Sequence, residues 1–118
     1  MIAKKIQDAL NDQINAEVGS SYLYWSMAAY FKSINLDGFA GWMTVQAQEE
    51  MSHAMKFYHF ILERGGKVTL KGLEDPQTQW ASPLAAFQAA YKHEQYITGR
   101  INKLVDLAIK ESDHATKA

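Results

Sequence analysis

Apolar residues recur at three- and four-residue steps along three long stretches of the chain, and polar residues fill the positions between them. This spacing is typical of amphipathic α-helices. It predicts helices over about residues 2–33, 37–65 and 83–112. Neither of the two prolines, Pro76 and Pro83, falls inside a predicted helix beyond its first residue. Since proline interrupts a helix interior, the three stretches suit long, continuous helices.

The residues around the predicted helix ends favour those ends. Asp37 is expected to cap the second helix, and Gly65-Gly66 to stop it. Ser82 followed by Pro83 is a favourable start for the third helix, because serine caps well and proline fits the first helical position.

The connections between the helices predict how they are arranged. The first turn is short, so the first two helices are expected to be antiparallel neighbours. Helices of this length are about 45 Å long. Within the crossover 66–82, the segment 66–81 alone can span about 53 Å at roughly 3.3 Å per residue, which lets the third helix start parallel to the second. We therefore expect an all-α, ferritin-like helix bundle with one long crossover, forming a single domain over residues 1–118.

Each predicted helix has one apolar stripe that we expect to face the core, and each stripe contains a carboxylate near its middle. The first stripe comprises Ile6, Leu10, Ile14, Glu17, Ser21, Tyr24, Ala28 and Phe31; the second comprises Trp42, Gln46, Glu50, His53, Phe57 and Phe60; the third comprises Leu84, Phe87, Tyr91, Glu94, Thr98, Ile101, Val105 and Ala108.

The mid-helix carboxylates predict a metal site. Burying several carboxylates together is costly because they lose water and repel each other, so such a cluster needs a cation. Glu50 and His53 are three residues apart and leave the same helix face. With Glu17 they form half of a di-iron carboxylate arrangement, and ligands without sulfur favour iron, manganese or zinc. A lone Glu-x-x-His pair also occurs on exposed helix faces, and Glu17 by itself could be solvated.

Two further residues beside this set have alternative interpretations. Glu49 lies beside the second stripe and is either an exposed acid or an outer metal ligand. Tyr24 shares the face of Glu17 and is either a packed core residue or a redox-active, hydrogen-bonding neighbour of the metals. The other histidines are expected at the surface: His59, His93 and His114.

Composition excludes several classes of function. The formal net charge is −1 and no basic run occurs, so neither nucleic acid nor a membrane surface is expected as a partner. The absence of cysteine excludes disulfides, cysteine-type zinc sites and thiol catalysis. The start of the chain lacks the apolar run of a signal peptide, and no apolar stretch of roughly 18 residues follows. A cytoplasmic location is expected.

Three segments resemble one known family. They are residues 15–24 (NAEVGSSYLY), residues 48–56 (QEEMSHAMK) and the pair His93-Glu94. Together they are similar to prokaryotic non-haem ferritin, and the resemblance covers all 118 residues. The Gln-Glu-Glu-x-x-His-Ala segment is its most specific part.

The resemblance implies a set of iron ligands. Glu17, Glu50 and His53 would form the first iron site of a ferroxidase centre. Glu50 would bridge to a second iron that Glu94 also binds, and Glu49 would be a ligand of a third iron site found in bacterial members.

The resemblance also implies an activity and a partner. Two ferrous ions would be oxidised by dioxygen or peroxide and stored as ferric mineral, in a homo-oligomeric cage of 24 subunits in the family. Tyr24 matches a tyrosine that the family carries beside the centre. Bacterioferritin is less similar, because Ile97 stands three residues beyond Glu94, where a second Glu-x-x-His would place histidine. No methionine is a compelling haem ligand, so no haem is expected.

The chain departs from the family in lacking the fourth long helix, although Ser112-Asp113 resembles the cap of a further helix. Three alternatives follow. Residues 1–118 belong to a longer polypeptide, the chain is a truncated, catalytically impaired helical oligomerisation module, or a second chain completes the bundle. In the last case, two copies of Glu17, Glu50 and His53 would supply a symmetric di-iron set, and Glu94 would be a bystander.

Overall fold

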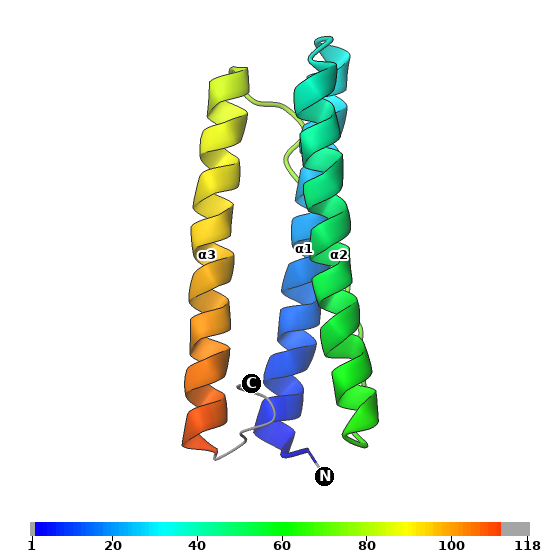
Figure 1. Cartoon of the computed structure of the whole chain (residues 1–118), viewed down its shortest axis with the longest axis vertical. Coiled ribbons are helices and arrows are strands. Elements are labelled where there is room, and N and C mark those ends of the chain that lie inside the picture. Colours follow the sequence, from blue (N-terminus) through cyan, green and yellow to red (C-terminus); the bar gives the residue numbers. More distant parts are fainter. Residues whose placement is uncertain (1, 112–118) are drawn as a thin grey trace.

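The computed structural model describes residues 2–111, and this part of the chain forms three long helices without any strand. They are α1 (Lys4–Ser33), α2 (Asp37–Glu63) and α3 (Pro83–Lys110). The three helices lie side by side along a common direction, with α1 antiparallel to both α2 and α3, which run parallel to each other (Figure 1). The all-α bundle with a long crossover is confirmed. None of the described helices combines the length and apolar character that crossing a membrane requires.

Helix α1 is the central element of the bundle. It packs along α2 and along α3, whereas no Cα atom of α2 lies within 8 Å of one in α3 among residues 2–111. Aromatic rings at one end connect α2 to α3, where Phe39 and Phe87 have ring centroids 5.0 Å apart. Because α1 lies against both other helices, its side chains can contact partners on α2 and on α3.

The core consists of two apolar clusters separated along the bundle axis. One surrounds Tyr24 and Phe31 of α1, and the other surrounds Ile6 and Leu10 at the opposite end of the same helix. Glu17 lies between them in the sequence of α1, and Glu50 lies between the corresponding residues of α2. Of the predicted metal ligands, Glu17 and Glu50 thus occupy a buried polar layer between the two apolar clusters.

The stripe predicted for α1 is confirmed, because all eight of its residues are buried. The stripes predicted for α2 and α3 are wrong in part: Trp42 is 50% exposed and Tyr91 is 68% exposed. Small side chains occupy much of the buried face instead, since alanine allows two helices to approach closely. The buried residues are Ala40, Met43, Ala47, Glu50, Ala54 and Ile61 in α2, and Ala86, Ala90, Ile97, Leu104 and Ala108 in α3.

The structure bears out two of the predicted helix ends and corrects one. The Ser82 hydroxyl accepts a hydrogen bond from the backbone N–H of Ala85, and Gly65 ends α2 with a positive φ of 74°. Asp37 is the first residue of α2 and not its cap, which is Leu36, and its carboxylate pairs with Lys32 at 2.9 Å. Ser112-Asp113 lies outside the described residues.

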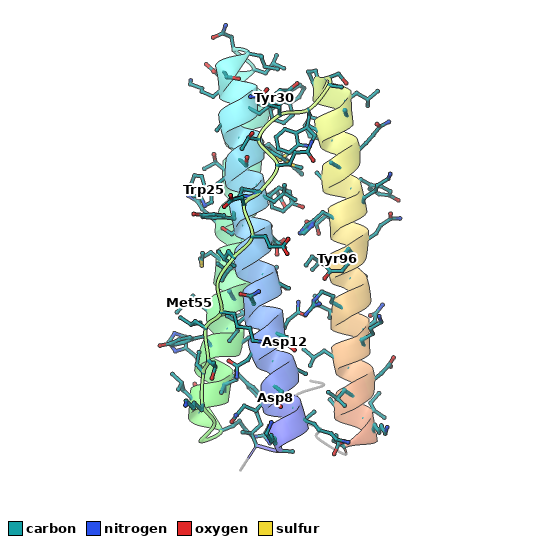
Figure 2. The ribbon with its side chains drawn as sticks, turned by 180° about the vertical axis from the view of Figure 1, so that it is seen from behind. Asp8, Asp12, Trp25, Tyr30, Met55 and Tyr96 are labelled. Carbon is teal, nitrogen blue, oxygen red and sulfur yellow. The ribbon has the colours of Figure 1, made fainter. Side chains whose placement is uncertain are left out.

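The crossover runs along the bundle, where side chains of α1 hold it (Figure 2). The Asn11 amide donates to the carbonyl of Lys67 at 2.9 Å and accepts from the backbone N–H of Thr69 at 2.8 Å. Further along, the Ser26 hydroxyl donates to the carbonyl of Gln77 at 2.6 Å. The long connection is therefore fixed by specific bonds and sets the parallel direction of α3.

Candidate metal centre

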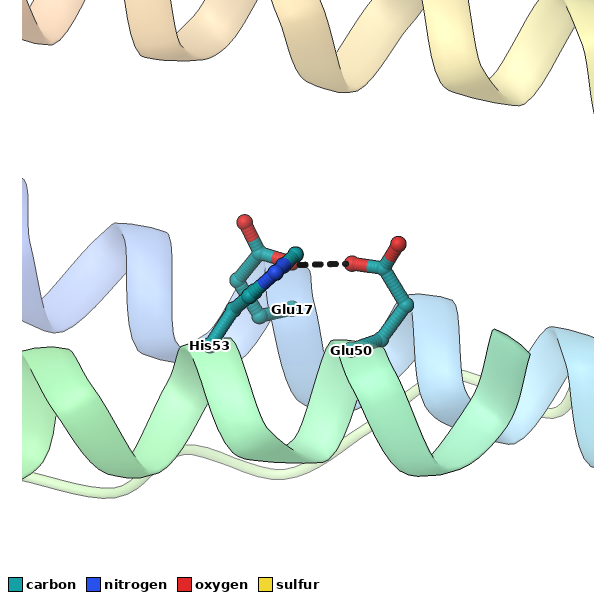
Figure 3. Close-up of side chains that lie close together, drawn as sticks. All are labelled: Glu17, Glu50 and His53. Atoms are coloured by element: carbon teal, nitrogen blue, oxygen red, sulfur yellow. Dashed lines mark ion pairs between the residues drawn. The ribbon is translucent and has the colours of Figure 1, made fainter. Parts of the chain in front are cut away.

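Three side chains from two helices converge at the polar layer. Glu17 comes from α1, while Glu50 and His53 come from α2, one helical turn apart. Each offers one ligand atom, and these atoms all lie within 4.8 Å of one another. His53 Nδ1 is 3.7 Å from Glu17 Oε2 and 3.6 Å from Glu50 Oε2. The three side chains point toward α3 (Figure 3).

The two carboxylates of this group are buried and incompletely bonded. Glu17 is fully buried and Glu50 is 4% exposed. Glu17 Oε2 and Glu50 Oε2 are buried and have no hydrogen-bond partner among the described residues. Burial raises the pKa of Glu50 above its ordinary value, and the neighbouring Glu17 carboxylate raises this pKa further. Such a site is electrostatically unfavourable until a cation enters it.

The geometry fits a metal ion. Protein oxygen and nitrogen ligands lie roughly 2.1 Å from a small divalent ion, so two ligands of one ion are at most about 4.2 Å apart. The separations of 3.6 and 3.7 Å around His53 meet this condition. The His53 side chain is 46% exposed, which gives the site an open side. Two carboxylates and one imidazole suit iron, manganese or zinc.

Glu94 and Tyr24 form a second unit next to this group. The buried Tyr24 hydroxyl donates to Glu94 Oε1, so the two predicted site residues are in direct contact. Burial raises the pKa of Tyr24 well above its usual range, and the hydrogen bond and charge of Glu94 add to this, so the hydroxyl stays a neutral donor. The charge of Glu94 also raises the pKa of Glu50. Glu94 lies outside the three-residue group, and its ligand role stays a prediction.

Glu49 lies on the exposed side of α2 next to Glu50. Its charge contributes to raising the pKa of Glu50, but it does not belong to the three-residue group. Its role at an outer iron site also stays a prediction.

The sequence analysis missed Gln13 and misplaced His93. Gln13 is 2% exposed and donates from Nε2 to Glu17 Oε1 at 3.0 Å. Its position four residues before Glu17, on the same helix face, was the signal that could have identified it.

The expected surface position of His93 is wrong, because this half-buried ring lies 2.6 Å from the Ser20 hydroxyl and edge-on to Tyr24. His59 is exposed as expected, and His114 lies outside the described residues.

Comparison with known proteins gives the family. A family model described as a ferritin-like domain matches residues 7–118. A bacterial non-heme ferritin from Bacteroides fragilis is 42% identical over 117 residues, which cover 99% of this chain and 74% of the relative. One from Staphylococcus haemolyticus is 37% identical, over 98% of this chain and 70% of the relative. The chain belongs to the prokaryotic non-haem ferritins.

Solved ferritin structures share the fold. An open-pore ferritin from the hyperthermophilic archaeon Archaeoglobus fulgidus has a TM-score of 0.96 and 55% identity, and the match covers 99% of this chain and 72% of that one. Chlorobium tepidum ferritin has a TM-score of 0.95 and 38% identity, with 99% and 72% covered. The three described helices therefore form a ferritin helix bundle, with Glu17, Glu50 and His53 in its polar layer.

Proposed function

We propose that this ferritin chain oxidises ferrous iron at a di-iron carboxylate centre and takes part in storing it as ferric mineral. One observation carries the proposal: two buried carboxylate oxygens without partners among the described residues face an imidazole nitrogen at distances that suit a single metal ion. Membership of the ferritin family supports iron, which is here the substrate and cargo, over manganese and zinc.

The chemistry of the ligands suits oxidation of that substrate. Glu17 and Glu50 are negatively charged when a metal is bound, and their charge stabilises ferric over ferrous iron because attraction grows with the charge of the ion. His53 completes the first site from the exposed side. Two ferrous ions can then supply two electrons to dioxygen, and with two protons this gives two ferric ions and hydrogen peroxide. Hydrogen peroxide can also be the oxidant: two ferrous ions and two protons reduce it to two water molecules.

We assign the second iron ion to Glu50 and Glu94. We assign Glu49 to an outer site through which the ferric product leaves. Tyr24 holds Glu94 through its hydroxyl, and this contact supports a role in orienting that ligand.

We further infer a homo-oligomer, and the family resemblance implies a cage of 24 subunits. Exposed aromatic side chains on α1, Tyr22 at 51% and Trp25 at 47%, support burial against other subunits. A cytoplasmic location stays a prediction.

The proposal is tested by iron oxidation in the purified chain. Ferrous iron is added without oxygen at two equivalents per chain, air is admitted, and ferric product and oxygen consumption are followed. We expect faster oxidation than in buffer and at least about a tenfold loss of the rate in Glu50→Ala, the scale for removing a group that binds a reacting metal. Glu63→Ala, at the exposed end of α2, is the matched control and should retain the rate.

Oxidation no faster than in buffer, together with no effect of Glu50→Ala, would support the alternative of a catalytically impaired oligomerisation module. A rate that rises steeply with chain concentration would instead support a centre that a second chain completes.

A further inference from the structure

A hydrogen-bonded series of side chains connects α3 to the metal ligand Glu17. Arg100 of α3 donates from Nε to Gln13 Oε1 at 3.3 Å. Gln13 then donates from Nε2 to Glu17 Oε1 at 3.0 Å. The amide between the two charged groups is 2% exposed, and the carboxylate is fully buried. Each of these two buried groups therefore has few alternative partners.

The chemistry of these groups fixes the direction of the series. A guanidinium group can only donate hydrogen bonds, so the Gln13 oxygen must face Arg100. The Gln13 NH₂ group then faces Glu17, where a carboxylate can only accept. Without Arg100 the amide is free to turn its oxygen toward Glu17, which would place two acceptors against each other.

Arg100 is itself held in place. Its Nη1 donates to the Tyr96 hydroxyl at 3.1 Å, and its guanidinium carbon lies 5.7 Å from the centre of the Tyr96 ring. Tyr96 extends from α3 on the side of α1 (Figure 2). Arg100 and Lys103 both line a cavity of about 260 Å³ between α1 and α3, together with Gln13. Of these two cations, Arg100 is the one that bonds to the amide.

We propose that Gln13 and Arg100 are positioning residues that hold Glu17 so that Oε2 alone is offered to a metal ion. Glu17 Oε1 is occupied by Gln13, while Glu17 Oε2 is buried, has no partner among the described residues and faces His53 at 3.7 Å. Glu17 thereby binds through one oxygen. This inference rests on the proposed function, since it assumes that Glu17, Glu50 and His53 bind a metal ion.

The sign of the Arg100 effect separates positioning from simple electrostatics. Removing a positive charge near a cation site should by itself strengthen metal binding, because repulsion is relieved. Positioning through Gln13 predicts the opposite, namely weaker binding. Lys103→Met is the matched control, because it removes the same charge from the same cavity without touching the hydrogen-bonded series.

The test uses Co²⁺, a redox-stable probe, with calorimetry for its affinity and visible absorption for its coordination. Gln13→Met, which keeps the shape of the side chain, should weaken Co²⁺ binding about tenfold or more and change the visible spectrum, because residues that orient ligands typically contribute roughly 10–100-fold. Arg100→Met should weaken binding by a smaller factor, and Lys103→Met should leave it equal or stronger. The double variant of Gln13 and Arg100 should bind Co²⁺ no more weakly than Gln13→Met alone, because the positioning effect of Arg100 acts through Gln13.

An unchanged affinity and spectrum in Gln13→Met would overturn the inference. So would equal effects of Arg100→Met and Lys103→Met, a comparison that stays decisive if Gln13→Met does not fold. Absence of Co²⁺ binding by the unaltered chain is a different result, because it would overturn the proposed function as well.

Discussion

Glu17 and Glu50 each bury a carboxylate oxygen that no donor among the described residues contacts. In a metal-free protein this arrangement opposes folding, because both groups lose water and repel each other when ionised. The same arrangement provides the attraction for a cation. Stability of the metal-free chain and affinity for metal are therefore opposed at these two residues, as is common at functional sites.

This opposition predicts a pH dependence. The pKa of Glu50 in the folded chain is raised from its ordinary value of 4.5 to about 9. Protonated Glu50 therefore contributes fully to the stability of the folded chain below about pH 4.5, and this contribution is lost as the pH rises toward about 9. Chemical denaturation should show that the metal-free chain is less stable at about pH 8 than at about pH 5. Glu50→Gln should reduce this difference and raise the free energy of unfolding at neutral pH by about 1 kcal/mol or more.

Glu63→Gln is the control for this experiment, because it removes a carboxylate from the exposed end of the same helix. A metal-free Glu50→Gln protein that is less stable than the unaltered chain at neutral pH would contradict the electrostatic account.

At the scale of elements, the crossover and α1 determine where α3 lies. Asn11 holds two backbone groups of the crossover through both ends of one amide, and it is only 7% exposed. Asn11→Ala should lower the free energy of unfolding by about 1–2 kcal/mol, because two hydrogen bonds to a buried side chain are lost. Proteolytic cleavage should become faster within residues 66–82.

The comparison for this substitution is the neighbouring ion pair between Asp12 and Lys71, which also joins α1 to the crossover. Its two charged atoms are 2.8 Å apart, and both side chains are exposed. Asp12→Ala should change the free energy of unfolding much less than Asn11→Ala does, because solvent screens an exposed ion pair. Equal effects of the two substitutions would contradict the special role of Asn11.

The elements also show what could be predicted from the sequence. All eight residues predicted for the α1 stripe are buried, because α1 is the central helix and packs against both others, although Tyr22 and Trp25 of the same helix stay exposed. On α2 and α3 the rule that large apolar residues face the core failed for Trp42 and Tyr91, because alanines form much of the buried face. Periodicity identifies a helix face, but small residues that permit close packing give a weak signal.

The candidate site was predictable to the extent that its ligands stand at recognisable positions in the sequence. Glu17, Glu50 and His53 were found because charged and polar side chains stand out on an apolar stripe. Gln13 was missed although it stands four residues before Glu17, and Arg100 was not found because its contact with Gln13 joins residues 87 positions apart. No local pattern encodes such a contact.

At the scale of the whole molecule, a metal ion bound by Glu17, Glu50 and His53 would link α1 to α2. Binding only to the folded chain should stabilise it by about 2.7 kcal/mol at a metal concentration roughly 100 times the Kd. For a domain of this size that raises the Tm by roughly 10 °C or more. Differential scanning calorimetry with and without Co²⁺ measures the shift, and His53→Ala, which removes a half-exposed ligand, should abolish most of it.

The order of the helices along the chain has a further consequence for biosynthesis. Glu17, Glu50 and His53 all belong to the first two helices, which pack against each other directly, whereas the partners on α3 are translated later. A hairpin of α1 and α2 therefore contains all three side chains of this group before α3 has been synthesised. The three-residue group is thus local in sequence, whereas the contacts that Glu94 and Arg100 make with α1 require the later helix α3.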